Sequence, residues 1–362
     1  MTKLKTTAGW LVTGLLLLFA FTARASEREV TITAPDGTTL AGTLTIPDKG
    51  VKGSVVFISG SGATDRTETI GPLKPFLTIS KAVTDAGYAT LRLDDRGTGA
   101  SKGDAKTTDL DTEAADISAA LAWIRTQPEL KNLPAGVFGH SQGGAVALML
   151  TDKRKNYTRP SFIITYGAPA IKGTDMMLAQ VEAMMKGQEP VWQQMKPILS
   201  RRYALVASDI PQQELIDKLT ADVMAQIPEA QRSNPALKAR IDAEVAQMSS
   251  IPYRSLLRYD PSPLYKDLNT RWIALYGEND QQAMPICFRR QCRTLPHGFS
   301  SPDLTTLVRP RQTVHRRFTR PWAKTLTNPS PTPLSSGSII SPAINKKCLN
   351  KSAKRCQIYK KC

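Results

Sequence analysis

Short apolar runs alternate with amphipathic stretches along the first 280 residues of the chain. Val30–Thr33 and Leu40–Ile46 flank the dipeptide Asp36-Gly37, a combination typical of a β-hairpin. Five further apolar runs predict strands: Val55–Ser59, Tyr88–Leu93, Ala135–Phe138, Phe162–Thr165 and Trp272–Tyr276. Because helical patterns separate most of these runs, the chain from Ser26 onward predicts an α/β fold, a mostly parallel sheet flanked by helices.

Helical periodicity marks two segments beside these strands. Five apolar residues at steps of four and three predict a helix with one face against the sheet: Leu110, Ala114, Ile117, Leu121 and Ile124. A second helix, Gln142–Leu150, is predicted directly after the strand Ala135–Phe138.

The segment 172–270, which separates the last two predicted strands, has helical periodicity and few β-branched runs. It holds seven of the ten methionines: Met176, Met177, Met184, Met185, Met195, Met224 and Met248. These residues are expected either to pack a small helical core or to line a cap whose flexible thioethers contact apolar substrates. The two interpretations are compatible, because a cap needs a core of its own.

The N-terminal segment has the features of an export signal. Lys3 and Lys5 precede an apolar run from Ala8 to Phe21, and Ala23-Arg24-Ala25 supplies a small-x-small cleavage site. This pattern predicts a signal peptide, residues 1–25, and a secreted or periplasmic protein with no stable membrane insertion after cleavage. The alternative is an uncleaved anchor, but the run is shorter than the roughly 20 residues that a membrane span needs.

Charge divides the chain into two parts. The formal net charge is +17, from 48 basic and 31 acidic residues. Sixteen Lys and Arg but only one acid, Asp303, follow Asp280, so 32 basic and 30 acidic residues remain in the first 280. The excess therefore belongs to the tail, and the balance of the rest is that of an ordinary globular domain, with no nucleic-acid partner expected.

The strongest chemical motif is Gly139-His140-Ser141-Gln142-Gly143, which has the G-x-S-x-G pattern and is followed by Gly144. It lies between a predicted strand and a predicted helix, the context that a nucleophilic serine on a sharp turn requires. Small residues two positions on either side let the strand and helix approach each other. The first N–H groups of the helix then face developing negative charge. Ser141 is therefore the candidate nucleophile.

Two loops carry the other candidate groups. Ser59-Gly60-Ser61-Gly62 follows a predicted strand, and we assign the oxyanion hole to the backbone N–H groups of Ser61 and Gln142, with Gly62 as the rival of Ser61. The turn Gly277-Glu278-Asn279-Asp280 follows the last predicted strand. Asp280 is the candidate acid of a triad, and Glu278 is the alternative.

The order of these motifs resembles the α/β-hydrolase superfamily: a Gly-Ser-Gly loop, an Asp-Arg-Gly-Thr-Gly loop, the elbow, a helical insertion and a Gly-Glu-Asn-Asp turn. Within it, the segment Ser59-Gly60-Ser61-Gly62-Ala63-Thr64-Asp65-Arg66 is similar to a signature of exported bacterial esterases of the serine-aminopeptidase-like branch. The resemblance covers about Val30 to Asp280. It implies a Ser–Asp–His triad acting on a small-molecule ester-like substrate, with no metal and no cofactor.

The resemblance also implies a histidine some 25 to 35 residues beyond the acid. His140 lies inside the elbow, His297 follows Asp280 by 17 residues, and His315 follows it by 35. His315 lies in the arginine-rich segment Arg309–Arg317, into which no apolar strand leads and which no helical pattern follows. Whether His297, His315 or neither is the general base is left open.

We infer that the chain after about Gln282 is translated out of frame. Synonymous codons permit a shifted reading of Gln282–Ile344 with an apolar strand, a Gly-Phe-Asn-His loop, a closing amphipathic helix and a stop codon, in that order. The shifted histidine spans the codons of Thr305 and Thr306, about 25 residues beyond Asp280. Codon choice permits this histidine without requiring it, so the order of all four features carries the inference.

A genuine tail has other interpretations. A basic segment could bind nucleic acid or an anionic surface, but it lacks interleaved aromatic residues. The five cysteines all follow Asp280: Cys287, Cys292, Cys348, Cys356 and Cys362. An odd number without a Cys-x-x-Cys pair is not typical of a disulfide framework or a zinc site. Under every interpretation the tail is expected to be disordered.

These observations predict a signal peptide (1–25), a hydrolase core in two parts (26–171 and 271–282), a cap (172–270) and an atypical tail (283–362). The predicted activity is a serine carboxylesterase that forms an acyl-enzyme on Ser141. A thioesterase or small-peptide hydrolase uses the same residues. The alternative from another class is a hydrolase-like protein that is catalytically impaired as written, because it lacks a properly placed histidine.

Resequencing the gene across codons 275 to 350 tests the frame. We expect an inserted or missing base there, which would make the charge excess and all five cysteines artefacts. An uninterrupted frame would contradict the inference and make the tail genuine.

Overall fold

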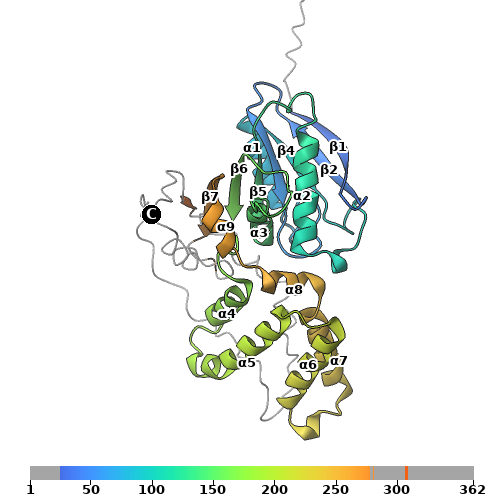
Figure 1. Cartoon of the computed structure of the whole chain (residues 1–362), viewed down its shortest axis with the longest axis vertical. Coiled ribbons are helices and arrows are strands. Elements are labelled where there is room, and N and C mark those ends of the chain that lie inside the picture. Colours follow the sequence, from blue (N-terminus) through green and yellow to red (C-terminus); the bar gives the residue numbers. More distant parts are fainter. Residues whose placement is uncertain (1–24, 278–279, 281–305, 309–362) are drawn as a thin grey trace, which may run out of the picture.

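The computed structural model describes residues 25–277, 280 and 306–308. Eight strands form one sheet in the order β1-β2-β4-β3-β5-β6-β7-β8 (Figure 1). Their bounds are β1 Ser26–Thr33, β2 Thr39–Ile46, β3 Gly53–Ile58, β4 Tyr88–Leu93, β5 Ala135–His140, β6 Phe162–Tyr166, β7 Arg271–Gly277 and β8 Thr306–Val308. The pairs β1–β2 and β2–β4 are antiparallel and all other pairs are parallel, which confirms the predicted fold class.

The N-terminal hairpin forms where Asp36-Gly37 predicted it. β1 and β2 pair along their whole length, from Ser26 opposite Ile46 to Thr33 opposite Thr39. Gly37 has φ +85°, a left-handed conformation that costs a glycine little. The backbone N–H of Thr38 donates to Asp36 Oδ1 at 3.0 Å, which closes the turn.

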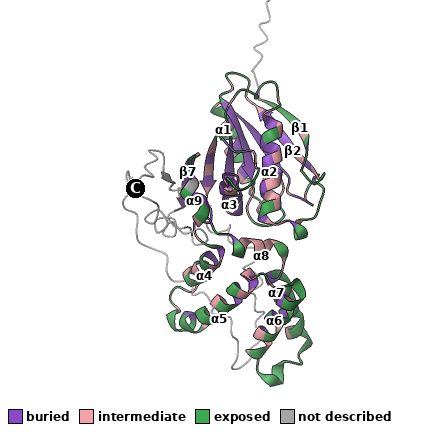
Figure 2. Cartoon of the chain, in the orientation of Figure 1, coloured by how far each residue is buried: buried purple, intermediate pink, exposed green. Residues whose placement is uncertain are grey.

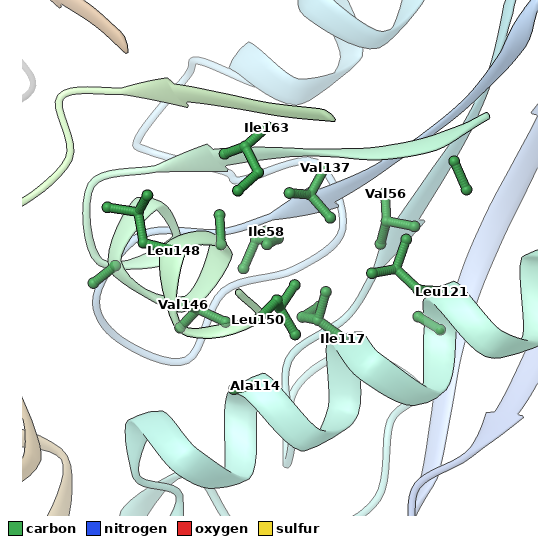
Figure 3. Close-up of a cluster of buried hydrophobic side chains, with 14 of the residues drawn as sticks. Val56, Ile58, Ala114, Ile117, Leu121, Val137, Val146, Leu148, Leu150 and Ile163 are labelled. Carbon is green, nitrogen blue, oxygen red and sulfur yellow. The ribbon is translucent and has the colours of Figure 1, made fainter. Parts of the chain in front are cut away.

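Helices cover both faces of the sheet: α1 Pro75–Asp85, α2 Leu110–Ile124 and α3 Gln142–Met149. Alternation along β3 separates the two faces. Val55 and Phe57 pack with Phe76 of α1, whereas Val56 and Ile58 belong to the main core beneath α2 and α3 (Figure 3). The sequence patterns anticipated α2 and α3, but α1 was not predicted.

The predicted apolar face of α2 is buried in full. Its five members are at most 7% exposed: Leu110, Ala114, Ile117, Leu121 and Ile124. Asp109 caps the helix by accepting from the backbone N–H of Thr112 at 2.8 Å. This bond satisfies one of the N–H groups that a helix start leaves unpaired.

In the described chain, β6 and β7 are connected by helices, with no strand between them. These helices are α4 Gly173–Met184, α5 Glu189–Ala207, α6 Gln212–Ala225, the 3-10 helix η2 Glu229–Gln231, α7 Pro235–Met248, α8 Ile251–Arg258 and α9 Ser262–Asp267. Another 3-10 helix, η1 Ala105–Thr107, precedes α2. Helices α4 to α8 extend from one end of the sheet and enclose their own buried cluster (Figures 1 and 2). That cluster includes Met176, Met177 and Met248, with Met224 packed against it. These four methionines therefore serve as core.

The first helix of the insertion, α4, begins against the end of α8. The Gly173 N–H, at the start of α4, donates to the Tyr259 carbonyl, just after α8, at 2.8 Å. A Cβ on Gly173 would lie 1.9 Å from the Leu256 carbonyl oxygen, so this crossing of α4 and α8 requires glycine. The N–H of Leu110 donates to Ser255 Oγ at 2.9 Å and ties α8 to the start of α2.

The expectation that no apolar strand leads into Arg309–Arg317 is wrong. Thr306–Val308 forms β8 and pairs in parallel with Leu275–Gly277 of β7. A run of three residues is too short for periodicity to reveal. It becomes a strand because the edge of β7 offers unpaired N–H and C=O groups. The rest of the segment 283–362, with its expected disorder, lies outside the described residues.

Within the described residues, the structure contains no helix that is both long and apolar enough to cross a membrane. The expected signal peptide lies outside this part of the chain, apart from Ala25.

We expect Leu121→Ala to lower the free energy of unfolding by about 2–5 kcal/mol, because Leu121 is fully buried beneath the sheet and its truncation leaves a cavity. Leu77→Ala is the matched control, since Leu77 on α1 is 40% exposed and should cost about 0.5 kcal/mol or less. Urea titration of both variants measures the difference. Equal losses would contradict the packing described for α2.

Candidate active site

Ser141 occupies a strained turn between β5 and α3. Its backbone angles are φ 51° and ψ −120°, and it is one of two non-glycine residues with positive φ in the described chain. Such a conformation costs of order 1–3 kcal/mol and persists only where the surroundings enforce it. Here the Ser141 N–H donates to the Tyr166 carbonyl on β6 at 2.9 Å, and the Ser141 carbonyl accepts from the Gly144 N–H at 2.9 Å.

The glycines of the elbow permit backbone contacts that no other residue would allow. A Cβ on Gly139 would lie 2.2 Å from the Gly143 carbonyl oxygen. A Cβ on Gly143 would lie 2.4 Å from the carbonyl oxygens of both Ile58 and Ser59, at the end of β3. The elbow glycines therefore bring the start of α3 against the loop that follows β3, as the sequence motif requires.

Gln142 is the first residue of α3, and no side chain caps this helix. Because the first N–H groups of a helix have no intrahelical acceptor, the Gln142 N–H is available at the positive end of the helix dipole. Its buried side chain points elsewhere, since Nε2 donates to Glu113 Oε1 on α2 at 2.7 Å. The backbone and the side chain of Gln142 thus have separate tasks.

The loop Ser59–Gly62 lies beside the elbow. A Cβ on Gly60 would be 3.4 Å from Ser141 Cβ. The Gly60 N–H is already occupied, because it donates to Glu68 Oε1 at 2.9 Å. The next two amides, those of Ser61 and Gly62, donate to no acceptor within the described part of the chain. Ser61, the donor assigned from the sequence, and Gly62, its rival, therefore both have an available N–H group.

Asp280 lies at the same edge of the sheet as Ser141. It follows β7, and its N–H donates to the Gly277 carbonyl at 3.1 Å. Tyr166 holds the elbow, because its carbonyl accepts the Ser141 N–H and its ring stacks on His140. Burial raises the pKa of Tyr166, and the charge of Asp280 raises it further. Asp280 is therefore close to the residues that hold the elbow. Glu278, the alternative acid, lies outside the described residues.

Two candidate histidines, His297 and His315, lie outside the described residues. His315 follows β8 by seven residues, which removes one argument for a shifted frame, since a strand does precede it. His140 is described, and its Nδ1 is 2.6 Å from Glu68 Oε1. The described chain thus brings together the nucleophile and both oxyanion loops, with Asp280 near their edge of the sheet.

Two arginines hold the loops around the site in place. Arg66 binds Asp94 through Nε at 3.1 Å and Nη2 at 2.8 Å. Arg96 binds Asp116 of α2 through Nε at 2.7 Å and Nη2 at 2.6 Å. Forked contacts of this kind fix orientation as well as distance. They give a structural reason for the Asp-Arg and Asp-Arg-Gly motifs of the sequence.

Four acidic residues line a cavity of about 90 Å³ beneath the oxyanion loop, and two of them, Asp95 and Glu113, have no arginine partner among the described residues. Asp95 accepts from Ser59 Oγ at 2.6 Å and from the Thr64 N–H at 3.0 Å. Asp95 and Glu113 both keep some exposed surface, yet protein atoms surround their carboxyl groups. Burial raises the pKa of Asp95 to about 7 and that of Glu113 to about 8, although hydrogen bonds to both oppose the rise.

Sequence reasoning did not identify Glu68, Asp95 or Glu113. Asp95 lies in the quoted Asp-Arg-Gly-Thr-Gly loop, which signalled a motif but no role for this carboxyl group. Glu68 lies two residues beyond the quoted signature, and Glu113 is one of two acids in the first turn of α2. No pattern distinguishes these acids from solvated ones. Within the described residues, no cluster of His, Cys, Asp and Glu is arranged to hold a metal ion.

Comparisons with curated proteins match parts of the chain. Esterase EstD of Thermotoga maritima is 30% identical over 158 residues, which is 43% of this chain and 35% of that protein. A Mycobacterium tuberculosis protein named as a phosphoribosyl transferase, Rv0571c, is 33% identical over 118 residues, which is 32% of this chain and 25% of that protein. The chain thus spans a quarter to about a third of the length of these relatives.

Solved structures share the fold. Esterase PF2001 of Pyrococcus furiosus superposes with a TM-score of 0.50 at 16% identity, covering 79% of this chain and 82% of that one. The α/β hydrolase GrgF from a Penicillium species gives 0.50 at 17% identity, covering 79% and 90%. The family model for serine aminopeptidase, S33, matches residues 53–247, more than half of the chain. This match, together with the elbow and the sheet order, shows that the chain belongs to the serine aminopeptidase S33 family of α/β-hydrolases.

Proposed function

We propose that this protein is a serine hydrolase that cleaves carboxylic esters through an acyl-enzyme on Ser141. The observation that carries the proposal is the strained backbone of Ser141, between the uncapped start of α3 and the glycine loop after β3. Strain of this kind is stored at functional sites, where it presents a side chain that a relaxed turn would not. The esterase named among the relatives supports the choice of ester.

In the proposed reaction Ser141 Oγ attacks the ester carbonyl carbon while a histidine removes its proton. The carbonyl oxygen becomes negatively charged and accepts hydrogen bonds from the N–H groups of Ser61 and Gln142. Collapse of this intermediate breaks the ester bond, and the histidine returns its proton to the leaving alcohol. Water then hydrolyses the acyl-enzyme by the same sequence of steps.

Asp280 is proposed to orient the histidine and to stabilise its charged form. Asp280 follows β7, and β8 is parallel to β7, so Val308 ends β8 at the edge of the sheet that carries Asp280. In the printed frame, this placement supports a base from the chain beyond Val308.

The electrostatics beneath the loop support an oxyanion at this place. An ionised carboxylate next to the hole would repel the developing charge. Because burial raises the pKa values of Asp95 and Glu113 to about 7 and about 8, both are largely neutral in mildly acidic solution. Asp94, in the loop after β4, is paired instead with an arginine, Arg66.

The family name favours a second substrate class, small peptides with a free amino terminus. The same nucleophile and oxyanion donors cleave esters and amides, so the substrate pocket decides between them. Comparing kcat/KM for p-nitrophenyl esters with that for aminoacyl p-nitroanilides separates the two.

Export through the N-terminal segment is likewise a proposal. N-terminal sequencing of the mature protein tests it, with Ser26 expected first.

We expect Ser141→Ala to lower turnover of p-nitrophenyl acetate by at least about 10³-fold, because it removes the nucleophile. Ser61→Ala is the matched control. The proposed role of Ser61 uses its backbone N–H, so this variant should remain within about threefold of the parent. Labelling with a fluorophosphonate, read by mass spectrometry, should modify Ser141 in the parent and nothing in Ser141→Ala. Equal turnover by parent and Ser141→Ala would favour the catalytically impaired alternative.

Glu113 gives a prediction on stability. Its folded-state pKa of about 8 lies above the value of about 4.3 for an unfolded chain. Between these values the unfolded chain releases a proton that the folded protein keeps, so this group lowers stability progressively as pH rises, by at most about 1.4 kcal/mol per pH unit. Glu113→Gln removes that loss. Its stability relative to the parent should therefore be higher at pH 8 than at pH 5 in urea titrations. Parallel profiles would contradict the raised pKa.

A further inference from the structure

Glu68 lies between the two loops that form the candidate site, although the sequence motifs did not include it. Its side chain is buried and its residue is 3% exposed. In the described chain it is the other non-glycine residue, besides Ser141, with a positive φ, here +53°. Of the described residues, no Arg or Lys forms an ion pair with it.

One oxygen of Glu68 joins both loops. Oε1 accepts from the Gly60 N–H at 2.9 Å and lies 2.6 Å from Nδ1 of His140. A carboxylate oxygen that accepts both bonds requires the proton on Nδ1 of His140. The glycine loop after β3 and the residue before the nucleophile are thus held by a single acceptor.

The turn that carries Glu68 is itself braced. The Glu68 N–H donates to the Asp65 carbonyl at 2.8 Å. Asp65 Oδ1 accepts from the backbone N–H groups of Thr67 and Thr69, at 2.8 and 3.2 Å. These bonds maintain the left-handed conformation that an unsupported glutamate would leave. Asp65 of the signature therefore keeps the carboxyl group of Glu68 directed at the site.

We propose that Glu68 is a positioning residue for acyl transfer, which sets the oxyanion loop against Ser141 by binding Gly60 and His140 together. The inference rests on the proposed function of Ser141. Gly60 is the residue whose Cβ would lie 3.4 Å from Ser141 Cβ, so its placement fixes the distance between loop and nucleophile. Glu68 also takes the Gly60 N–H away from the substrate, which leaves the amides of Ser61 and Gly62 as the available donors of this loop.

The test compares three substitutions by kcat and KM on p-nitrophenyl acetate. Glu68→Ala leaves the Gly60 N–H without its acceptor and should lower kcat about tenfold or more, with KM within about threefold, because only transition-state contacts are lost. Glu68→Gln keeps an Oε1 acceptor for both bonds and should remain within about threefold of the parent. Glu68→Gly removes the side chain and the backbone strain together. It should show the same loss of kcat while keeping the thermal transition, and it replaces Glu68→Ala if that variant does not fold.

His140→Ala removes the other contact. Because both residues act through one linkage, the double variant Glu68→Ala/His140→Ala should lose no more kcat than the worse single variant. Glu129→Ala, at an exposed acid remote from the site, controls for charge.

An undiminished kcat in both Glu68→Ala and Glu68→Gly would overturn the proposal. So would a rise in KM without a fall in kcat in these two variants. A Glu68→Gln variant as slow as Glu68→Ala would overturn it as well. Failure of the proposed function gives a different result: Ser141→Ala would then turn over as fast as the parent.

Discussion

The candidate site depends on the contact between two pieces of backbone, the start of α3 and the end of β3. Gly143 lies against the carbonyl oxygens of Ile58 and Ser59, where a Cβ would be 2.4 Å from each. This contact determines how far the glycine loop stands from Ser141, and the distance between nucleophile and oxyanion donors follows from it. The unfavourable backbone angles of Ser141 are the cost of that approach. The sheet register, the glycines and the buried core between α2, α3 and β3 all serve to maintain it.

Around this contact, acidic side chains fall into two groups with different physical states. Asp94 and Asp116 are paired with arginines and hold loops to the sheet and to α2. Glu68, Asp95 and Glu113 have no Arg or Lys partner among the described residues and touch the glycine loop or the elbow directly. A charge beside the oxyanion hole would oppose catalysis, whereas a hydrogen-bond acceptor there orders the loop. Burial reconciles the two requirements for Asp95 and Glu113, because it favours the neutral acid.

Local patterns predicted most of the sheet, α2 and α3, because their signals are contained in short windows: a continuous apolar run in β3, an apolar stripe at steps of four and three in α2, and glycines around Ser141. They did not reveal α1, where Phe76 is the one fully buried apolar residue, or β8, which becomes a strand only by pairing with β7. The elbow with Ser141 and Gln142 is one short motif and the glycine loop is another, so the sequence identified both. Glu68 was not, because its role arises from the fold, which brings residues 60, 68 and 140 together. Such a long-range acceptor leaves no pattern in the sequence.

The base of the proposed triad is constrained by the sheet even though the tail has an unusual composition. β8 runs parallel to β7, so the chain leaves it at Val308 on the edge that carries Ser141 and Asp280. In the printed frame this makes His315, seven residues on, the residue in the right order along the chain. In the shifted frame the histidine coincides with the codons of Thr305 and Thr306, where the printed chain begins β8. The two readings therefore exclude each other. A strand at Thr306–Val308 supports the printed frame, whereas the cysteine-rich and arginine-rich composition supports the shifted one. Topology limits where the base enters the site, and the reading frame determines which residue it is.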